Sequence, residues 1–223
     1  MNGYWLSEEA QEWETAIPIG NGRIGASVWG KIENERITIN EESMWYGGKR
    51  SHKNKDAHRY VGKVRELLLK NQVEDAEFLC QMSMTGTPKY VRPYQMACDL
   101  NFLFSNHHKP VEHYRRELDL GRAVTTVTYT MDETRYCREY FVSMKQLIVM
   151  RLTAKGKNQL KFQFNINRRP FELHSGGNGN DMIYLKGQCG DGVNYYGAAM
   201  LGYHDGKAIQ LGDYLAVTGA HEA

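Results

Sequence analysis

Two polar loops near the N-terminus carry the side chains best suited to bind a ligand rich in hydroxyl groups. Residues 19–23 and residues 40–48 both combine turn-forming glycines with groups that exchange hydrogen bonds with hydroxyls. Contacts to another domain use the same residue types, because interfaces also favour Trp and Arg. Ligand binding and interdomain packing therefore both stay open for the candidate residues, which are Asn21, Arg23, Asn40, Glu41, Ser43 and the flat-ringed Trp45.

Several carboxylates lie in expected loops, where they could act as acid and base in the hydrolysis of a glycosidic bond. That chemistry needs two carboxylic groups about 5–9.5 Å apart. The sequence shows no two of them converging, and carboxylates in loops are usually only solvated. The five candidates, Glu8, Glu9, Glu41, Glu42 and Asp191, thus define no catalytic pair.

The histidines and cysteines do not have the spacing of a metal site. His107 and His108 are adjacent on an expected strand and would point to opposite faces, so they could not share a metal ion. We therefore expect surface histidines and no bound metal at His107, His108 or His113. No C-x-x-C pair occurs, which favours reduced and mostly buried thiols over zinc ligands or disulfides. The four thiols are Cys80, Cys98, Cys137 and Cys189.

Residues 20–25 read GNGRIG and match the dinucleotide-binding pattern G-x-G-x-x-G letter for letter. That pattern binds a pyrophosphate only where a helix begins at the glycines. Residues 26–30 instead continue as a strand that contains Val28 and Trp29, for which we expect core packing. We therefore expect a tight turn here, and no nucleotide or other cofactor.

The pattern along the chain predicts a mainly β fold with one helical insert. Alternating apolar residues predict a hairpin over residues 22–41, and a three-to-four residue period predicts two short helices within about residues 56–82, broken near Asn71. Later strands are expected near residues 135–143, 146–153, 159–166, 181–187, 193–203, 207–211 and 214–218. Residues 168–181 are expected to form a mobile loop, because they are rich in Gly, Asn and Ser.

Strands at about ten-residue spacing favour an antiparallel β-sandwich, and we expect residues 1–223 to form one domain with the helical insert packed on its outside.

The composition excludes several classes of partner. Hydrophobic residues make up 41% and charged residues 24%, and 28 basic and 26 acidic side chains are scattered along the chain. No apolar run is long enough to cross a bilayer, and no basic stripe suits nucleic acid. The start of the sequence lacks the features of a secretory signal, which favours a cytoplasmic location.

Taken together, five stretches resemble the N-terminal domain of glycoside hydrolase family 95, a family of α-L-fucosidases. The most specific are residues 13–26 (WETAIPIGNGRIGA) and 35–48 (ERITINEESMWYGG). Residues 114–124, residues 138–143 and the helical stretch 65–77 match more loosely, in the same order and at similar spacing. The turn at residues 94–100 (YQMACDL) departs from the family, in which Pro and Gly are usual, so no role is carried over to it.

The resemblance, which spans nearly the whole chain, implies a supersandwich-like first domain followed by a helical linker, a catalytic (α/α)6 barrel and a C-terminal β domain. The expected parent enzyme hydrolyses terminal α-L-fucosides, or related α-L-galactosides, with inversion. Its catalytic acid and its positioned water belong to the barrel, so no catalytic residue is expected within residues 1–223 and this chain alone should be inactive. The expected partners are a fucosylated oligosaccharide and the protein's own barrel.

Two rival functions stay open at this stage. A free-standing carbohydrate-binding module would need an exposed aromatic platform on a complete sandwich, and tight sugar binding by this chain would favour it. A mutarotase-like enzyme acting on free sugars would need a general acid and base in one concave site. No such pair can be assembled from the sequence.

Overall fold

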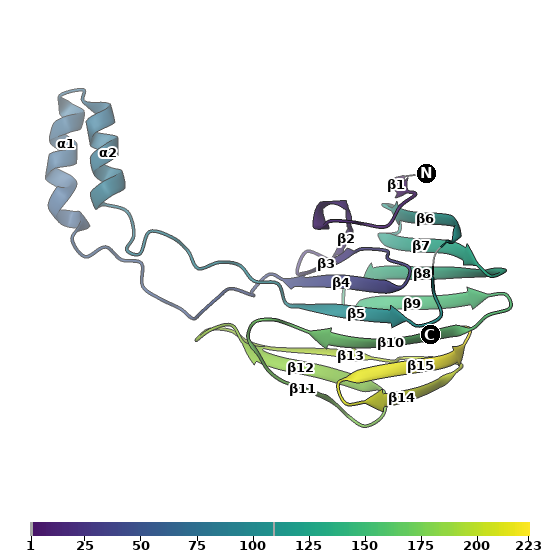
Figure 1. Ribbon diagram of the computed structural model, residues 1–223. Coiled ribbons are helices and arrows are strands. Elements are labelled where there is room, and N and C mark those ends of the chain that lie inside the picture. The colour runs from purple at the N-terminus through teal and green to yellow at the C-terminus, as the bar shows by residue number, and fades with distance from the viewer. Residues whose placement is uncertain (1, 109) are drawn as a thin grey trace.

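The computed structural model describes residues 2–108 and 110–223 as an antiparallel β-sandwich from which a helical hairpin projects (Figure 1). A five-stranded and a seven-stranded sheet form the two main layers. A third sheet, of three strands, is formed by residues from the second half of the chain. Every paired strand runs antiparallel to its neighbour. The predicted fold class is confirmed, with no parallel pair among the described strands.

The sheets are defined by their strand order and bounds. The five-stranded sheet consists, in order, of β1 (Gly3–Leu6), β6 (Glu112–Asp119), β7 (Val124–Met131), β8 (Thr134–Val142) and β9 (Ile148–Lys155). The seven-stranded sheet runs β14 (Lys207–Leu211), β15 (Tyr214–Ala220), β10 (Leu160–Asn167), β5 (Cys98–Phe104), β4 (Asn34–Glu41), β3 (Ile24–Val28) and β2 (Ile17–Gly20). The third sheet consists of β11 (Glu172–Gly177), β12 (Met182–Gln188) and β13 (Asn194–Met200), and a 3-10 turn, η1 (Trp13–Thr15), precedes β2.

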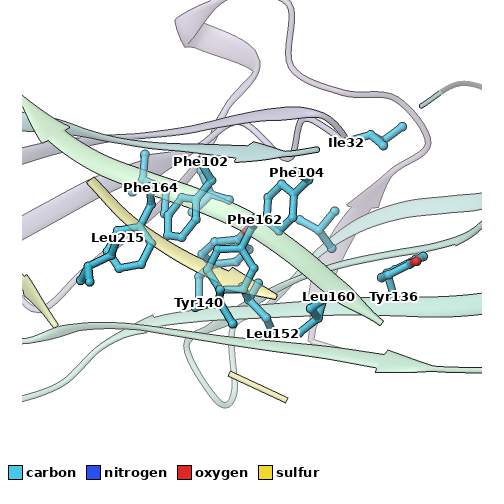
Figure 2. Packing of buried hydrophobic residues seen from close by; sticks show 14 of the residues in the cluster. Ile32, Phe102, Phe104, Tyr136, Tyr140, Leu152, Leu160, Phe162, Phe164 and Leu215 are labelled. Carbon is cyan, nitrogen blue, oxygen red and sulfur yellow. The ribbon is translucent and has the colours of Figure 1, made fainter. Parts of the chain in front are cut away.

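The core lies between the layers and is rich in aromatic rings (Figure 2). Alternate residues of β7 and β10 are buried, as expected when successive side chains of a strand point to opposite faces. Phe102 stacks at 5.1 Å on Phe164 and lies 6.0 Å from Phe162, so neighbouring strands present their rings to one another. Burial of such rings is the main favourable contribution to the stability of this fold.

The helical insert consists of η2 (Ala57–Tyr60), α1 (Val61–Leu69) and α2 (Val73–Ser83), with the predicted break at Asn71, whose φ is 59°. Its predicted position in the sequence is correct, but its predicted packing on the outside of the sandwich is wrong. Figure 1 shows the two helices packed side by side and standing away from the sheets. The reason is that the flanking segments pair with each other, through Thr87 N to His52 O at 3.0 Å and Asn54 Nδ2 to Ser83 O at 2.7 Å, and so extend outward together.

The prediction of a mobile loop at residues 168–181 is also wrong in part, because these residues contain β11. This strand pairs with β12 from Glu172↔Gly187 to Gly177↔Ile183. Its two glycines and its polar residues gave no alternating apolar pattern, so only pairing with β12 defines it as a strand. No helix in the described residues is long and apolar enough to cross a membrane. A cytoplasmic location stays a prediction.

Candidate functional site

Both candidate loops lie at the same end of the seven-stranded sheet. The turn at residues 21–23 precedes β3, and the loop after residue 41 follows β4. Because β3 and β4 are antiparallel, with Ile24 opposite Glu41, the start of one strand adjoins the end of the other. A backbone hydrogen bond from Glu42 N to Arg23 O at 3.1 Å joins the two loops.

Glu41 is the centre of the polar contacts in this cluster. One carboxylate oxygen accepts a hydrogen bond from Arg23 Nε at 3.1 Å, and the other accepts two from Ser43, of which the backbone one is 2.9 Å long. Partial burial would raise the pKa of Glu41, but the hydrogen bonds from Ser43 and Arg23 outweigh it and lower that pKa. Glu41 is therefore held ionised, as an acceptor that fixes the loop, and it is unsuited to act as a general acid.

Asn21 braces the turn against the other sheet. Its amide nitrogen donates to Ser143 O at 2.9 Å and to Gln146 Oε1 at 3.1 Å, in the connection between β8 and β9. Its amide oxygen accepts from the backbone of Arg23 and Ile24, both at 3.0 Å. Both polar atoms of Asn21 are thus occupied by structural contacts, and the glycine-rich run is a tight turn between strands.

Among the candidate residues, Asn40 and Trp45 are the least engaged by the protein itself, and Arg23 also stays accessible, with 58% of its side chain exposed. Within residues 2–108 and 110–223, the Asn40 side chain has no hydrogen bond. The Trp45 side chain is 43% exposed, donates to Glu42 O at 3.2 Å and meets Tyr94 edge-on, with ring centroids 5.3 Å apart. Arg23, Glu41, Ser43 and Trp45 form one cluster, whereas Asn21 is directed to the other sheet.

Tyr94 and the pair Arg92–Asp191 belong to this end of the molecule, and of the three only Asp191 was considered from the sequence, as one of the candidate carboxylates. Tyr94 donates its hydroxyl proton to Glu41 O at 2.7 Å, and Arg92 binds Asp191 at 3.0 Å. Together with Trp45, Arg92 lines a shallow cavity of about 280 Å³ between this loop and the base of the helical hairpin. The motif at residues 94–100 was the available signal for Tyr94, whereas no local pattern joins Arg92 to a residue so distant in the sequence.

Glycines allow the loop after β4 to pack closely on the loop after β12. Gly47 N donates to Cys189 O at 2.8 Å, and a Cβ on Gly192 would lie 2.1 Å from the backbone of Gly47. The buried Arg168 ties the same loops to β5, with one nitrogen donating to Ala97 O at 3.1 Å and another to Cys189 Sγ at 2.8 Å. The candidate loops are therefore held rigidly by the rest of the domain.

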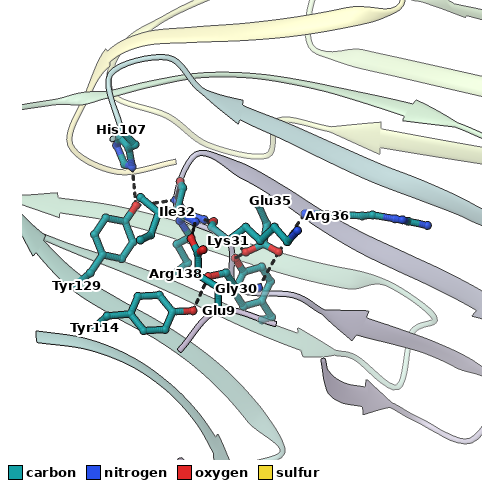
Figure 3. A network of polar contacts seen from close by, with 11 residues as sticks. Glu9, Gly30, Lys31, Ile32, Glu35, Arg36, His107, Tyr114, Tyr129 and Arg138 are labelled. Carbon is teal, nitrogen blue, oxygen red and sulfur yellow. Dashed lines mark hydrogen bonds and ion pairs between the residues drawn. The ribbon is translucent and has the colours of Figure 1, made fainter. Parts of the chain in front are cut away.

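A second polar cluster lies in the core, between the two main layers (Figure 3). The fully buried Arg138 donates to the carbonyls of Lys31 and Ile32, both at 2.6 Å, and forms an ion pair with Glu35 at 3.4 Å. Burial raises the pKa of Glu35, and the positive charge of Arg138 opposes that shift. The cluster ties β8 to the turn before β4.

The histidines and cysteines lie differently from what their spacing suggested. The expectation of surface histidines is wrong for His107, which is buried against Phe104 and Tyr129, because the chain bends back toward the core after β5. His108 is exposed, as expected, and lies 4.0 Å from Asp132. All four cysteines are free, with Cys98 and Cys189 buried, and the described residues contain no group of metal-ligating side chains.

Comparisons with known proteins agree on the class of enzyme from which such domains come. Residues 4–223 match the family model described as the N-terminal domain of glycosyl hydrolase family 65. The chain is 32% identical to alpha-L-fucosidase 2 of Arabidopsis thaliana over 93% of its own length and 25% of that protein. It is 30% identical to probable alpha-fucosidase A of Aspergillus niger, over 64% of this chain and 18% of that protein, and 24% identical to the protein of the same name from Aspergillus oryzae.

These relatives confirm the resemblance to a fucosidase N-terminal domain, although the matching model is described under family 65 rather than family 95. The chain spans about a quarter of the length of the Arabidopsis protein and less of the Aspergillus niger protein.

Proposed function

The chain belongs to the family of N-terminal domains of glycosyl hydrolase family 65, and on this premise we propose that it is the accessory domain of a longer α-L-fucosidase. The single observation that carries this proposal is the 32% identity to alpha-L-fucosidase 2 over 93% of the chain. The longer protein would hydrolyse terminal α-L-fucosides, or related α-L-galactosides, with inversion. The catalytic acid and the positioned water would come from an (α/α)6 barrel outside residues 1–223.

The exposed apolar residues of the helical hairpin support docking on another part of the same protein. Leu69 is 88% exposed and Phe78 is 66% exposed, and Leu68, Val73 and Met82 are exposed with them. Large apolar side chains that gather on one exposed surface are typical of an interaction site. We assign the catalytic barrel as the partner of this hairpin.

The ionised state of Glu41 supports an accessory role for the candidate loops. Inverting hydrolysis needs one protonated and one ionised carboxyl group about 6.5–9.5 Å apart. Glu41 is hydrogen-bonded by Arg23 and Ser43, which lowers its pKa despite partial burial, so it cannot supply the protonated group near neutral pH. Asn40 and Trp45 are the residues of these loops that we expect to contact the substrate or the barrel.

Release of fucose by the longer protein tests this proposal. 2′-Fucosyllactose is a suitable neutral substrate, and proton NMR during the first turnover distinguishes the β-anomer, which inversion produces, from the α-anomer. We expect the β-anomer first. Release of the α-anomer would refute inversion, and no release from any terminal α-L-fucoside or α-L-galactoside would refute the fucosidase assignment.

Substitution of Asn40 and Trp45 then distinguishes contact with the substrate from packing between domains. In the longer protein, Trp45→Ala and Asn40→Ala should be assayed for hydrolysis alongside thermal unfolding, with Lys157→Ala, in the exposed turn between β9 and β10, as the control. A raised KM or lowered kcat at unchanged Tm indicates contact with substrate. A lowered Tm with near-normal kinetics indicates packing on the barrel.

A further inference from the structure

A polar cleft of about 420 Å³ lies on the outer face of the seven-stranded sheet, away from the candidate loops. Its floor comes from β4, β5 and β10, and Trp29 and Tyr214 stand at its two sides. The opposite face of the same strands supplies Phe102, Phe162 and Phe164 to the core. Asn34, Arg36, Asn101, Leu103, Gln163 and Asn165 of the cleft are therefore the outward half of an alternating pattern, and they are not needed to bury the core.

The strand register sets the cleft side chains in a straight row across the sheet. Arg36 lies opposite Asn101, Asn101 lies opposite Asn165, and Asn165 lies opposite Tyr214. Trp29 extends the row, because its backbone nitrogen donates to Arg36 O at 3.4 Å. Neighbouring strands are about 4.8 Å apart, so five such positions span about 19 Å. That length exceeds one pyranose ring and suits a short oligosaccharide lying across the strands.

Several polar groups of the cleft are not used by the protein itself. Within residues 2–108 and 110–223, the side-chain amides of Asn34 and Gln163 and the Tyr214 hydroxyl have no hydrogen-bond partner. Asn101 reaches Asn165 only through a long contact of 3.4 Å. The buried indole nitrogen of Trp29 also has no acceptor in the described part of the chain. That nitrogen is shielded from solvent and out of reach of a ligand in the cleft, so the free amides and the Tyr214 hydroxyl are the groups that a ligand can use.

The charges in the cleft favour a neutral ligand. The guanidinium of Arg36 is paired with Asp99 at 2.9 Å, the amides carry no charge, and the Lys31 ammonium lies over the Trp29 ring at 5.2 Å. Arg36 also lies over this ring, at 5.4 Å, so the ring is engaged by cations and is not free to stack on a sugar. Tyr214, which is partly exposed at the other side, has a ring that can stack on the apolar face of a sugar.

We propose that this cleft is a carbohydrate-binding site for a neutral oligosaccharide, separate from the site of hydrolysis. The amides of Asn101, Gln163 and Asn165 bind hydroxyl groups, and Tyr214 stacks on one ring. The choice of an oligosaccharide among neutral polar ligands rests on the proposed function. The site holds the glycan near the enzyme while the barrel cleaves its terminal residue.

Binding of defined oligosaccharides to the 223-residue chain tests the site directly. The probes are an array of neutral oligosaccharides that includes 2′-fucosyllactose, together with acidic oligosaccharides, and calorimetry then gives affinities for those that bind. We expect a neutral probe to bind, with an affinity that changes little between 50 mM and 500 mM salt, because no charge is engaged. Binding of none of the neutral probes, or of acidic probes alone, overturns the proposal.

Paired substitutions locate the binding on the sheet. Gln163→Ala and Tyr214→Ala should each weaken the affinity by about 5-fold to 10-fold, the loss expected for one hydrogen bond or one stacked ring. Lys161→Ala, on the same strand and outward face but outside the cleft, should leave it unchanged. Unchanged binding by both cleft variants, with native circular dichroism, overturns the site. Because fucose release by the longer protein is measured separately, failure of binding here leaves the hydrolase assignment standing.

Discussion

Arg138 lies in the aromatic core with Glu35 as its charged partner, and the two are also joined through shared neighbours. The Tyr140 hydroxyl donates to Glu35 Oε2 at 3.1 Å, and Arg138 donates to the Tyr129 hydroxyl at 2.6 Å. The guanidinium also lies 3.7 Å from the ring centre of Phe104. At the scale of single residues, this network fixes how the two layers meet. The free-energy cost of burying its charges is low only while every member is present.

Removal of Arg138 should therefore destabilise the sandwich more than its size suggests. Arg138→Met leaves the Glu35 carboxylate buried without its cation, which costs about 3–5 kcal/mol. Urea unfolding followed by fluorescence measures the change. Arg138→Met with Glu35→Gln should recover part of the loss, because no buried charge then remains. The control Arg151→Met, at an exposed arginine, should change the unfolding free energy little. An equal loss of unfolding free energy in Arg138→Met and Arg151→Met would show that the buried ion pair adds no stability of its own.

His107 should make the fold sensitive to mild acid. Burial, with repulsion from Arg138 and His108, lowers its pKa from 6.5 to about 3. The Tyr129 hydroxyl accepts from Arg138, so its proton faces His107 Nδ1 at 2.5 Å, and the neutral imidazole fits that arrangement. Between pH 6.5 and pH 3 the unfolded chain binds one more proton, so this stability is present above pH 6.5 and is lost as the pH falls.

The expected loss from this one group between pH 6.5 and pH 4.5 is about 2–3 kcal/mol. Urea unfolding at the two pH values measures it. His107→Gln keeps an acceptor for Tyr129 but cannot titrate, so its stability should depend less on pH over this interval. The exposed neighbour variant His108→Gln should follow the wild type. Parallel pH profiles for all three proteins would rule out His107 as the cause.

At the scale of elements, glycine determines how tightly the candidate loops can pack. Gly192→Ala places a Cβ 2.1 Å from the Gly47 backbone, so we expect a loss of about 1–3 kcal/mol in unfolding free energy. Gly62→Ala on α1 is the matched control, because nothing lies within 4 Å of its added methyl. Alanine favours a helix, so the control should gain about 0.5–1 kcal/mol. Equal changes in both variants would contradict the close loop packing.

The helical hairpin should be dispensable for folding of the sandwich. His52 and Thr87 are hydrogen-bonded at 3.0 Å, so a short Gly/Ser turn can join them in place of residues 53–86. Thermal unfolding of this shortened chain should shift by less than about 3 °C, or about 1 kcal/mol for a domain of this size. A larger drop in Tm would mean that the helices stabilise the sheets, contrary to their position in Figure 1.

The sequence was most informative where periodicity alone defines an element. The apolar periods predicted α1 and α2 and their break at Asn71, and alternation predicted β8, β10 and β12 within one or two residues. It failed where a strand lacks an alternating apolar pattern and is defined only by its pairing, as for β11, and where a contact joins remote residues, as between Arg92 and Asp191. The sequence predicted the loop cluster around Glu41, because those residues are neighbours across one hairpin, but periodicity did not reveal that the helices project.

At the scale of the whole molecule, the domain presents three separate surfaces. The candidate loops lie at one end of the seven-stranded sheet, the cleft lies on the outer face of that sheet, and the apolar hairpin projects from the connection between β4 and β5 (Figure 1). None of the three is needed to bury the aromatic core. A domain of this kind can hold a partner and a glycan together while the sandwich itself stays rigid.

Fucose release from 2′-fucosyllactose by three proteins tests the accessory role most directly. They are the longer protein, the same protein without residues 1–223, and the 223-residue chain alone, each measured at equal concentration with its folding checked by circular dichroism. We predict release by the longer protein, at least about tenfold less by the shortened protein because contacts worth about 1.4 kcal/mol or more are lost, and none above the buffer rate by this chain. Release of fucose by the isolated chain, or equal rates with and without it, would contradict the account.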